Sequence, residues 1–401
     1  MTVTIEKSVA RGKISAPPSK SAAHRALIAA ALSAGGEVKN IEYSSDICAT
    51  LDCLNALGAK LEKKESSVLL GALNPFAAPE CDIDCRESGS TLRFLLPLCM
   101  LSGSKITLRG TKRLFSRNLG IYEEIAAKNG VELLKGDDFI TVKGKLKSGN
   151  YKVAGNISSQ FITGLLFALP LLEGDSNLEI IGNFESAPYV ELTLEALKNA
   201  GINIEKKSDT LFCISGAQQY KCAGITVEGD YSNAAFLDGF NMLGGSVIVE
   251  GLSKNSLQGD RVYIDMYKDL KNGVKEFELS NCPDLAPVMF ALSAVYGGAQ
   301  FMGTARLKIK ESDRANAMKQ ELEKFGIKVE VSENDVTIFG GQLVKPKETL
   351  CGHNDHRIVM ALSLLCSVTG GSISEAESVA KSYPDFFEKI KSLGIVVKDE
   401  S

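Results

Sequence analysis

Apolar and polar positions follow a pattern that occurs six times along the chain. In each repeat an apolar, helix-like stretch ends in a turn of small residues. The six turns are SAGGEV (33–38), LSGSKI (101–106), LEGDSNLEI (172–180), LGGSVI (243–248), YGGAQF (296–301) and TGGSIS (369–374). An amphipathic helix follows each turn and closes on a glycine, since glycine supplies the left-handed residue that ends a helix. The closing glycines are Gly58, Gly130, Gly201, Gly273, Gly326 and Gly394.

The intervals between these glycines are 72, 71, 72, 53 and 68 residues, and a unit of about 70 residues is too long for a solenoid repeat. Alternating runs such as Ile202–Glu205 and Ile327–Glu330 predict strands after the closing glycines. The pattern therefore predicts an α/β protein of six β-α-β-α-β units, three in each of two domains, with the change of domain near Val227–Asn233.

Composition narrows the class of protein without changing this picture. The 401 residues are 44% hydrophobic and 23% charged, and 45 Lys and Arg against 49 Asp and Glu give a net charge of −4. A nucleic-acid-binding domain is usually basic, so nucleic acid is not the expected partner. No apolar run is long enough to span a membrane, the first residues lack a signal-peptide core, and ten cysteines form no CxxC pair. We expect a reduced, cytoplasmic protein with free thiols.

The segment PPSKSAAHRALIAAAL places cations at a helix start. Pro17-Pro18 forces an extended chain, after which Ser19 or Ser21 can cap a helix that runs to about Leu32. Ser21 and Arg25 lie four residues apart on one face, beside Lys20. The positive end of a helix disfavours cations in a merely solvated first turn, so this pattern favours an anion site.

Two more helix starts carry polar groups, with weaker signals. In RESGSTLRFLLPL, Gly89 allows close approach of a ligand, Ser90 can cap, and Arg93 follows. In GNISSQFITGLL, neutral donors from Ser158, Ser159 and Gln160 precede an apolar helix. Simple capping explains either segment as well as ligand binding does.

In the second half, KIKESDR places Lys310 and Glu311 within one helical turn of Arg314. Glu311 is then either paired with Arg314, as on many solvated helices, or free to transfer protons. Asp284 in CPDLAPVMF is either a helix cap or a base.

CGHNDHR suggests a zinc site of Cys351, His353 and His356, but the spacing does not suit a closed tetrahedral site and no second pair follows. We therefore expect no metal there, and interpret His356 and Arg357 as another polar helix start.

If the helices run parallel within each half, these helix starts converge on one cleft between the two domains. Such a cleft would hold small polyanions. The chain contains no GxxxxGK[ST] and no GxGxxG, so neither a nucleotide nor a dinucleotide is indicated.

The motifs PSKSAAHRAL, SGSTLRF, TKRLFSRNLG, SSQFITGLL, KIKESDR, NDHRIVMAL and KSYPDFFE occur in an order that resembles the 5-enolpyruvylshikimate-3-phosphate (EPSP) synthase family. The resemblance runs from Lys13 to about Leu393. It implies a two-domain inside-out α/β barrel. Its lower domain would comprise residues 1–19 plus 229–401 and its upper domain residues 20–228, with the active site in the cleft between them.

The resemblance also implies two substrate-binding sets. Shikimate-3-phosphate would bind Lys20, Ser21, Arg25, Ser158, Ser159, Gln160, Ser186, Asp284 and Lys310. Phosphoenolpyruvate would bind Lys20, Gly89, Arg117, Gln160, Glu311, Arg314, His356, Arg357 and Lys381. The implied chemistry is addition and elimination of an enolpyruvyl group, with Asp284 as base, Glu311 as proton donor and acceptor, and Lys20 as a further catalytic group.

No metal or organic cofactor is indicated, the expected partners are these two small molecules alone, and a monomer is the family default. Since Gly89 is retained, the resemblance also implies sensitivity to glyphosate, the inhibitor that binds beside it.

Three positions depart from the family pattern. Arg86-Glu87 precedes the Ser-Gly, Phe94 follows Arg93, and Arg306 stands where an Asn is common. Two alternative functions remain. UDP-N-acetylglucosamine enolpyruvyl transferase is disfavoured because Arg109–Leu119 contains no cysteine. A non-catalytic anion-binding protein of the same fold is disfavoured because Asp284 and Glu311 are both present.

Overall fold

The computed structural model describes residues 1–222 and 224–400. The chain forms two units: an inserted unit, Lys20–Val227, and a terminal unit, Met1–Ser19 with Glu228–Ser401. Glu228 falls in the terminal unit, one residue from the boundary expected from the sequence. Within the described residues no helix is both long and apolar enough to cross a bilayer.

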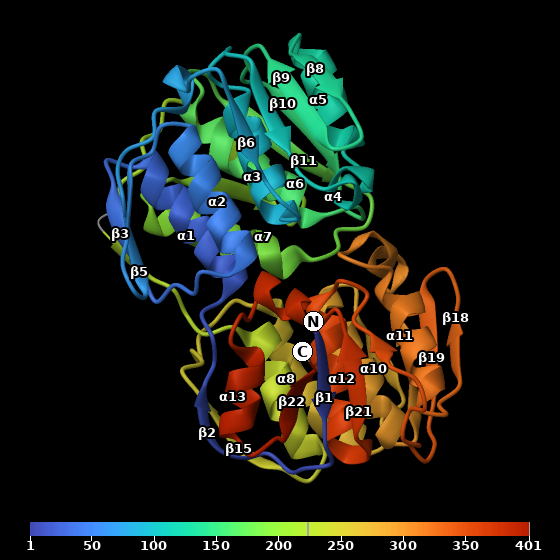
Figure 1. Ribbon diagram of the computed structural model, residues 1–401. Coiled ribbons are helices and arrows are strands. Elements are labelled where there is room, and N and C mark those ends of the chain that lie inside the picture. Colours follow the sequence, from blue (N-terminus) through green and yellow to red (C-terminus); the bar gives the residue numbers. More distant parts are fainter. Residues whose placement is uncertain (223, 401) are drawn as a thin grey trace. The chain divides into compact units, whose positions relative to one another are not determined.

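The inserted unit contains three four-stranded sheets and the helices that connect their strands (Figure 1). Its helices are α1 (Lys20–Leu32), α2 (Ser45–Ala56), α3 (Gly89–Cys99), α4 (Lys112–Ser116), α5 (Gly120–Asn129), α6 (Ser159–Ala168) and α7 (Ala187–Asn199). Its strands are β3 (Gly36–Lys39), β4 (Leu61–Lys63), β5 (Ser67–Leu70), β6 (Cys81–Asp84), β7 (Ile106–Arg109), β8 (Glu132–Lys135), β9 (Phe139–Lys143), β10 (Asn150–Ala154), β11 (Ser176–Ile181), β12 (Ile204–Ser208), β13 (Leu211–Ile214) and β14 (Gly224–Thr226).

The terminal unit contains two four-stranded sheets and one two-stranded sheet. Its helices are α8 (Tyr231–Met242), α9 (Tyr263–Lys271), α10 (Ala286–Val295), α11 (Arg314–Lys324), α12 (His356–Thr369) and α13 (Phe386–Ser392). Its strands are β1 (Thr2–Ile5), β2 (Arg11–Ser15), β15 (Ser246–Glu250), β16 (Glu276–Glu278), β17 (Gly298–Met302), β18 (Val329–Val331), β19 (Asp335–Phe339), β20 (Leu350–Cys351), β21 (Gly371–Ser374) and β22 (Val397–Glu400). Strand β1 pairs with both β21 and β22, so the two chain ends lie side by side (Figure 1).

All five four-stranded sheets share one pairing order, a parallel pair followed by two antiparallel pairings. One example is β6-β7-β9-β8, in which β6 and β7 are parallel. The repeat is therefore strand–helix–strand–helix followed by two strands, one strand more than the sequence pattern predicted. The predicted strands at residues 202 and 327 begin two residues later, as β12 and β18.

The two-stranded sheet of β2 and β15 explains the short glycine interval. Between Gly130 and β10 lies the hairpin of β8 and β9, whereas β16 begins at Glu276, directly after Gly273. The missing hairpin shortens this repeat from about 70 residues to 53. All six closing glycines have positive φ, from 70° at Gly130 to 117° at Gly58, as the helix-ending role predicted.

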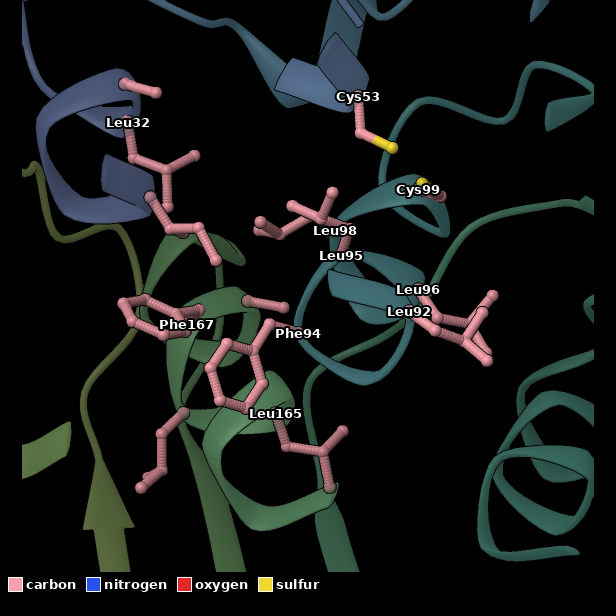
Figure 2. Close-up of a cluster of buried hydrophobic side chains, with 14 of the residues drawn as sticks. Leu32, Cys53, Leu92, Phe94, Leu95, Leu96, Leu98, Cys99, Leu165 and Phe167 are labelled. Carbon is pink, nitrogen blue, oxygen red and sulfur yellow. The ribbon is translucent and has the colours of Figure 1, made fainter. Parts of the chain in front are cut away.

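The most apolar helix of each repeat lies inside its unit and the sheets lie outside. Nearly every residue of α6 and α10 is buried, whereas β11 alternates between buried and exposed positions. In the inserted unit, Phe94 of α3 and Phe167 of α6 have ring centroids 6.1 Å apart and lie with Leu165 on one side of α3, while Leu92 and Leu96 lie on the other side (Figure 2). This arrangement, with helices within and sheets around them, is the inside-out α/β fold.

Gly164 determines how closely α6 packs against α3. A Cβ atom at Gly164 would lie 2.2 Å from the Arg93 carbonyl oxygen and 2.4 Å from the Tyr122 hydroxyl. We expect Gly164→Ala to lower the free energy of unfolding by about 1–3 kcal/mol through overpacking, measured by urea denaturation. The control is Gly120→Ala at the first residue of α5, where a Cβ meets only the side chain of Asn118. A Gly164→Ala variant as stable as this control would contradict the packing argument.

Candidate active site

In the inserted unit, Lys20 is the first residue of α1, and its ammonium Nζ lies 2.9 Å from Asp46 Oδ2 in the first turn of α2. Both side chains are mostly buried. The carboxylate offsets the unfavourable placement of a cation at the positive end of a helix. Helix α1 begins at Lys20, so Ser21 lies within its first turn and is not the cap.

Arg25 is buried among neutral groups. Its guanidinium donates to the carbonyl oxygens of Ser21 (2.7 Å) and Tyr189 (2.8 Å) and to the Thr193 hydroxyl (2.9 Å), and it stacks on Phe94 at 5.2 Å. Burial lowers the pKa of Arg25 to about 10, which still leaves it charged at neutral pH. Since these partners carry no charge, its positive charge is available to an anion.

A buried chain of hydrogen bonds connects the start of α1 to the start of α3. His24 Nδ1 lies 2.8 Å from the Thr50 hydroxyl, which lies 2.7 Å from the Thr91 hydroxyl, and this in turn donates to Ser88 Oγ at 2.7 Å. Burial, together with the charges of Lys20 and Arg25, holds the pKa of His24 well below its ordinary value, so the imidazole is neutral. The chain fixes the Gly89 backbone relative to Lys20.

Helix α3 is capped by Ser88, whose hydroxyl accepts from Thr91 N, so the expected cap Ser90 was wrong. Ser90 instead accepts a hydrogen bond from Gln160 Nε2 at 2.9 Å, while Gln160 Oε1 accepts from Arg93 Nη1 at 2.7 Å. A Cβ atom at Gly89 would lie 2.8 Å from Arg93 Nη1, 3.0 Å from Arg117 Nη1 and 3.4 Å from Gln160 Oε1. Gly89, Arg117 and Gln160 thus lie together, and only glycine leaves room between them.

Arg117 is a buried cation beside Gly89. Its side chain is 8% exposed, and its Nε is buried without a hydrogen-bond partner. Within the part of the chain that the structure describes, no carboxylate lies within ion-pair distance of it, while Arg93 brings a second positive charge close by. A buried charge that is neither paired nor solvated is costly, and a bound anion would remove that cost.

The serines expected to bind phosphate occupy two helix starts. Ser158 caps α6 by accepting from Gln160 N, and Ser159 is buried in the first turn. Ser186 precedes α7 with φ of +57°, an uncommon conformation for a residue with a side chain. Three residues later, the Tyr189 carbonyl binds Arg25, so Ser186 lies on the segment that holds this guanidinium.

In the terminal unit, Asp284 is surrounded by three cations. Its carboxylate lies 2.7 Å from Arg314 Nη1, 3.1 Å from Arg357 Nη2 and 3.3 Å from Lys310 Nζ. Burial would raise the pKa of Asp284, but these charges outweigh burial and hold its pKa well below the ordinary value. Asp284 is therefore ionised at neutral pH, and it is not the cap that its position at a helix start also allowed.

Arg314 is 0% exposed and holds three carboxylates at once. Besides Asp284, it donates to Glu311 Oε2 at 2.6 Å and to Asp355 Oδ2 at 2.9 Å. Burial disfavours its charge, but the three carboxylates raise the pKa of Arg314 well above its ordinary value. Glu311 is thus paired with Arg314, and the alternative of a solvated surface pair does not apply because Arg314 is buried.

The remaining predicted residues of this unit are His356, Arg357, Lys310 and Lys381. Asp355 caps α12 and accepts from Arg357 N, which places His356 and Arg357 in the first turn. Burial lowers the pKa of Lys310, despite the nearby Asp284 carboxylate. Lys381 donates from Nζ to the Asn354 carbonyl at 2.6 Å.

The structure shows the contacts of Arg86, Phe94 and Arg306, which lie at the three positions that depart from the family pattern. Arg86, with φ of +53°, forms an exposed ion pair with Asp52 at 2.7 Å. Phe94 stacks with Arg25 and packs on Phe167. Arg306 is buried, donates to the Ser280 carbonyl, and its charge contributes to the lowered pKa of Lys310.

Several partners in these networks were not predicted from the sequence, namely Asp46, Thr163, Tyr189, Thr193 and Asp260. Thr163 lies 2.8 Å from Thr193 and 3.4 Å from Arg25 Nη2. The sequence contained one indication of Asp46, because it is an acidic residue at a helix start. It contained no indication of the other four. No cluster of three or more His, Cys, Asp or Glu residues suited to a metal occurs among the described residues. The ring of His353, considered above as a zinc ligand, lies instead 3.0 Å from Glu321 Oε1.

The sequence and the fold of this chain were compared with those of known proteins, and both comparisons find enzymes of one family. The sequence model of EPSP synthase (3-phosphoshikimate 1-carboxyvinyltransferase) matches residues 5–390. The chain is 40% identical to a 3-phosphoshikimate 1-carboxyvinyltransferase of Clostridium kluyveri, over 98% of this chain and 97% of that protein. It is 37% identical to one of Brachyspira hyodysenteriae, over 99% and 100% of the two chains. A solved EPSP synthase from Acinetobacter baumannii, 22% identical, has the same fold with a TM-score of 0.80 and complete coverage of both chains.

Asp260 provides a test of the electrostatics in the terminal unit. Burial and the charge of Asp284 raise the pKa of Asp260 from 3.8 to about 7, although Arg357 and a hydrogen bond from Ser232 oppose this shift. The folded protein then keeps a proton that the unfolded chain releases. The free energy of unfolding should therefore fall as pH rises from about 4 to about 7, by a few kcal/mol in order of magnitude, and level off above that range.

Asp260→Asn should abolish this component of the pH dependence, measured by urea denaturation between pH 4.5 and 8. The control is the exposed Asp265→Asn on α9, which should behave like the wild type. Parallel pH profiles for Asp260→Asn and the wild type would contradict a raised pKa at Asp260.

Proposed function

The chain belongs to the EPSP synthase family, and on that premise we propose that it transfers the enolpyruvyl group of phosphoenolpyruvate to the 5-hydroxyl of shikimate-3-phosphate and releases phosphate. The structural observation that supports this most is Arg117, a buried guanidinium without a carboxylate partner among the described residues, beside Gly89 and Gln160. Both substrates are polyanions, and a site that binds them needs such uncompensated charge.

We assign shikimate-3-phosphate chiefly to the inserted unit. Arg25 would bind its carboxylate, while Ser158, Ser159 and Ser186 would surround its phosphate. Lys20, Ser21 and Gln160 complete this side, and Asp284 and Lys310 come from the terminal unit. The neutral surroundings of Arg25 support its role, since no carboxylate among the described residues is paired with it to compete with the substrate.

Phosphoenolpyruvate would bind Lys20, Gly89, Arg117 and Gln160 from the inserted unit and Glu311, Arg314, His356, Arg357 and Lys381 from the terminal unit. Because each substrate would need residues of both units, we propose that the units close around the substrates, driven by shikimate-3-phosphate. The protein would act as a monomer, since each chain contains both sets of residues.

The chemistry would proceed by addition and then elimination. The 5-hydroxyl attacks C2 of phosphoenolpyruvate as its own proton is removed and C3 gains a proton. Phosphate then leaves as C3 loses a proton, which restores the double bond. Asp284 is ionised and would accept the hydroxyl proton; its basicity would increase when Lys310 and Arg357 turn part of their charge to the substrates.

Glu311 would donate and later remove the proton at C3. Arg314 holds its Oε2 at 2.6 Å and thereby orients the carboxyl group. Lys20, held by Asp46, would be a second acid–base group and would also stabilise charge that develops on the departing phosphate.

Phosphate release separates the proposed activity from its alternatives. The purified chain is incubated with phosphoenolpyruvate and either shikimate-3-phosphate, UDP-N-acetylglucosamine or no acceptor. We expect phosphate only with shikimate-3-phosphate. Phosphate release only with the UDP-sugar would indicate the other enolpyruvyl transferase. If no phosphate is released with either acceptor, the chain would be an anion-binding protein without this activity.

Arg117→Ala should raise the KM for phosphoenolpyruvate more than tenfold, because it removes the uncompensated charge beside Gly89. The matched control is Arg109→Ala in the same unit, an exposed arginine that pairs with Asp82 at 2.7 Å. Steady-state kinetics with each substrate varied in turn measures the effect. An unchanged KM in Arg117→Ala would remove Arg117 from the proposed site.

Glu311→Gln and Asp284→Asn should each lower kcat by about 10²–10⁴-fold, the usual contribution of a positioned acid or base. Substrate binding should weaken less, which isothermal titration with shikimate-3-phosphate can measure. The exposed Glu323→Gln on α11 is the control for a change of the same kind outside the site. Near-normal turnover in either active-site variant would exclude that residue from the mechanism.

A further inference from the structure

The loop between β20 and α12 has a strained backbone. His353 and Asn354 have φ values of +51° and +48°, so two consecutive residues with side chains adopt the left-handed conformation. Each such residue costs on the order of 1–3 kcal/mol and persists only where surrounding contacts enforce it. The loop leads directly to Asp355, His356 and Arg357 at the start of α12.

Glu321 of α11 provides some of the contacts that stabilise this left-handed turn. Its carboxylate is 1% exposed and accepts from Cys351 N at 2.9 Å and from Lys324 Nζ at 2.8 Å. Its Oε1 lies 3.0 Å from His353 Nε2, so this ring nitrogen carries a proton and donates. Burial would raise the pKa of Glu321, but the hydrogen bonds from His353 and Lys324 outweigh burial and lower it, which keeps the carboxylate ionised.

A second carboxylate holds the other side of the same loop. Glu375 Oε2 accepts from Asn354 N at 2.5 Å, and the Asn354 carbonyl accepts from Lys381 Nζ at 2.6 Å. The backbone N–H of Asn354 is thus bound by Glu375, and its carbonyl oxygen holds Lys381. A change in the turn at His353 would therefore move Lys381 as well as the start of α12.

Helix α11 contacts the loop at two points. Arg314 and Glu321 are seven residues apart, about two helical turns, and so lie on one face of the helix. Arg314 binds Asp355 at the end of the loop, and Glu321 binds Cys351 and His353 at its beginning. The same helix thus fixes both ends of the segment 351–355.

We propose that Glu321 and His353 are positioning residues for phosphoenolpyruvate: their contact holds the left-handed turn that orients His356, Arg357 and Lys381. This inference rests on the proposed function for the identity of the substrate. The loop geometry that it requires is independent of the proposed function. Neither residue is assigned to bind a substrate.

Two variants test the contact. Glu321→Gln keeps the size of the side chain but cannot accept from both Cys351 and His353 as the carboxylate does. His353→Asn tolerates the left-handed backbone, but its side chain is too short to replace the contact with Glu321. We expect both variants to raise the KM for phosphoenolpyruvate about tenfold, with the KM for shikimate-3-phosphate changed less than twofold.

Hydrogen exchange provides a readout that does not depend on activity. Without substrates, amides of residues 351–357 should exchange faster in both variants than in the wild type. Glu323→Gln, two residues further along α11 and exposed, is the control and should change neither exchange nor KM.

Each outcome either supports or overturns the inference. Faster exchange together with a raised KM for phosphoenolpyruvate supports it. Unchanged exchange, or unchanged KM in active variants, overturns it, and so does an equal rise in both KM values. If Glu321→Gln does not fold, His353→Asn alone decides. If the wild type forms no product, the proposed function fails, and unchanged exchange would still overturn the positioning role.

Discussion

The terminal unit depends on a single buried cation, Arg314. Its guanidinium binds Asp284, Glu311 and Asp355, which come from three separate segments, and its shortest contact with each is 2.9 Å or less. Removing one partner from a buried charge network leaves the others uncompensated, which is strongly destabilising. The same cation therefore joins three segments of this unit and orients the two carboxylates proposed to move protons.

The two units differ in how they treat buried charge. In the Arg314 network of the terminal unit, cations and carboxylates neutralise one another. In the inserted unit, Arg25 is surrounded by neutral groups, and Arg117 has no carboxylate partner in the described part of the chain. The uncompensated charges of Arg25 and Arg117 fit the role proposed for the inserted unit, which is to attract anionic substrates.

Part of the backbone strain in each unit lies next to a helix start of the proposed site. Ser186 precedes α7, and His353 and Asn354 precede α12, all with positive φ. Because a residue with a side chain reaches this region at a cost, packing and hydrogen bonds elsewhere must compensate. Glu321 and Glu375 perform that role in the terminal unit. The precision of the site therefore depends on residues outside it.

The sequence determined the sixfold repeat, the closing glycines and the α/β class, because hydrophobic periodicity and the left-handed preference of glycine are local properties. The inside-out arrangement was implied only by the resemblance to a known family. The sequence also predicted Lys20, Arg25, Asp284 and Arg314 as site residues, since cations are unusual where a helix begins and the motifs resemble a known family; their roles remain proposals. It did not predict the hairpin that completes five repeats, the cap at Ser88, or the partners Asp46, Thr193 and Glu321. Those depend on which segments meet in space. The three partner contacts link residues 26 to 168 positions apart, and only packing decides which of the neighbouring serines caps α3. Whether a charged side chain is paired or left to bind a ligand is a property of its surroundings, and only the tertiary structure brings those surroundings together.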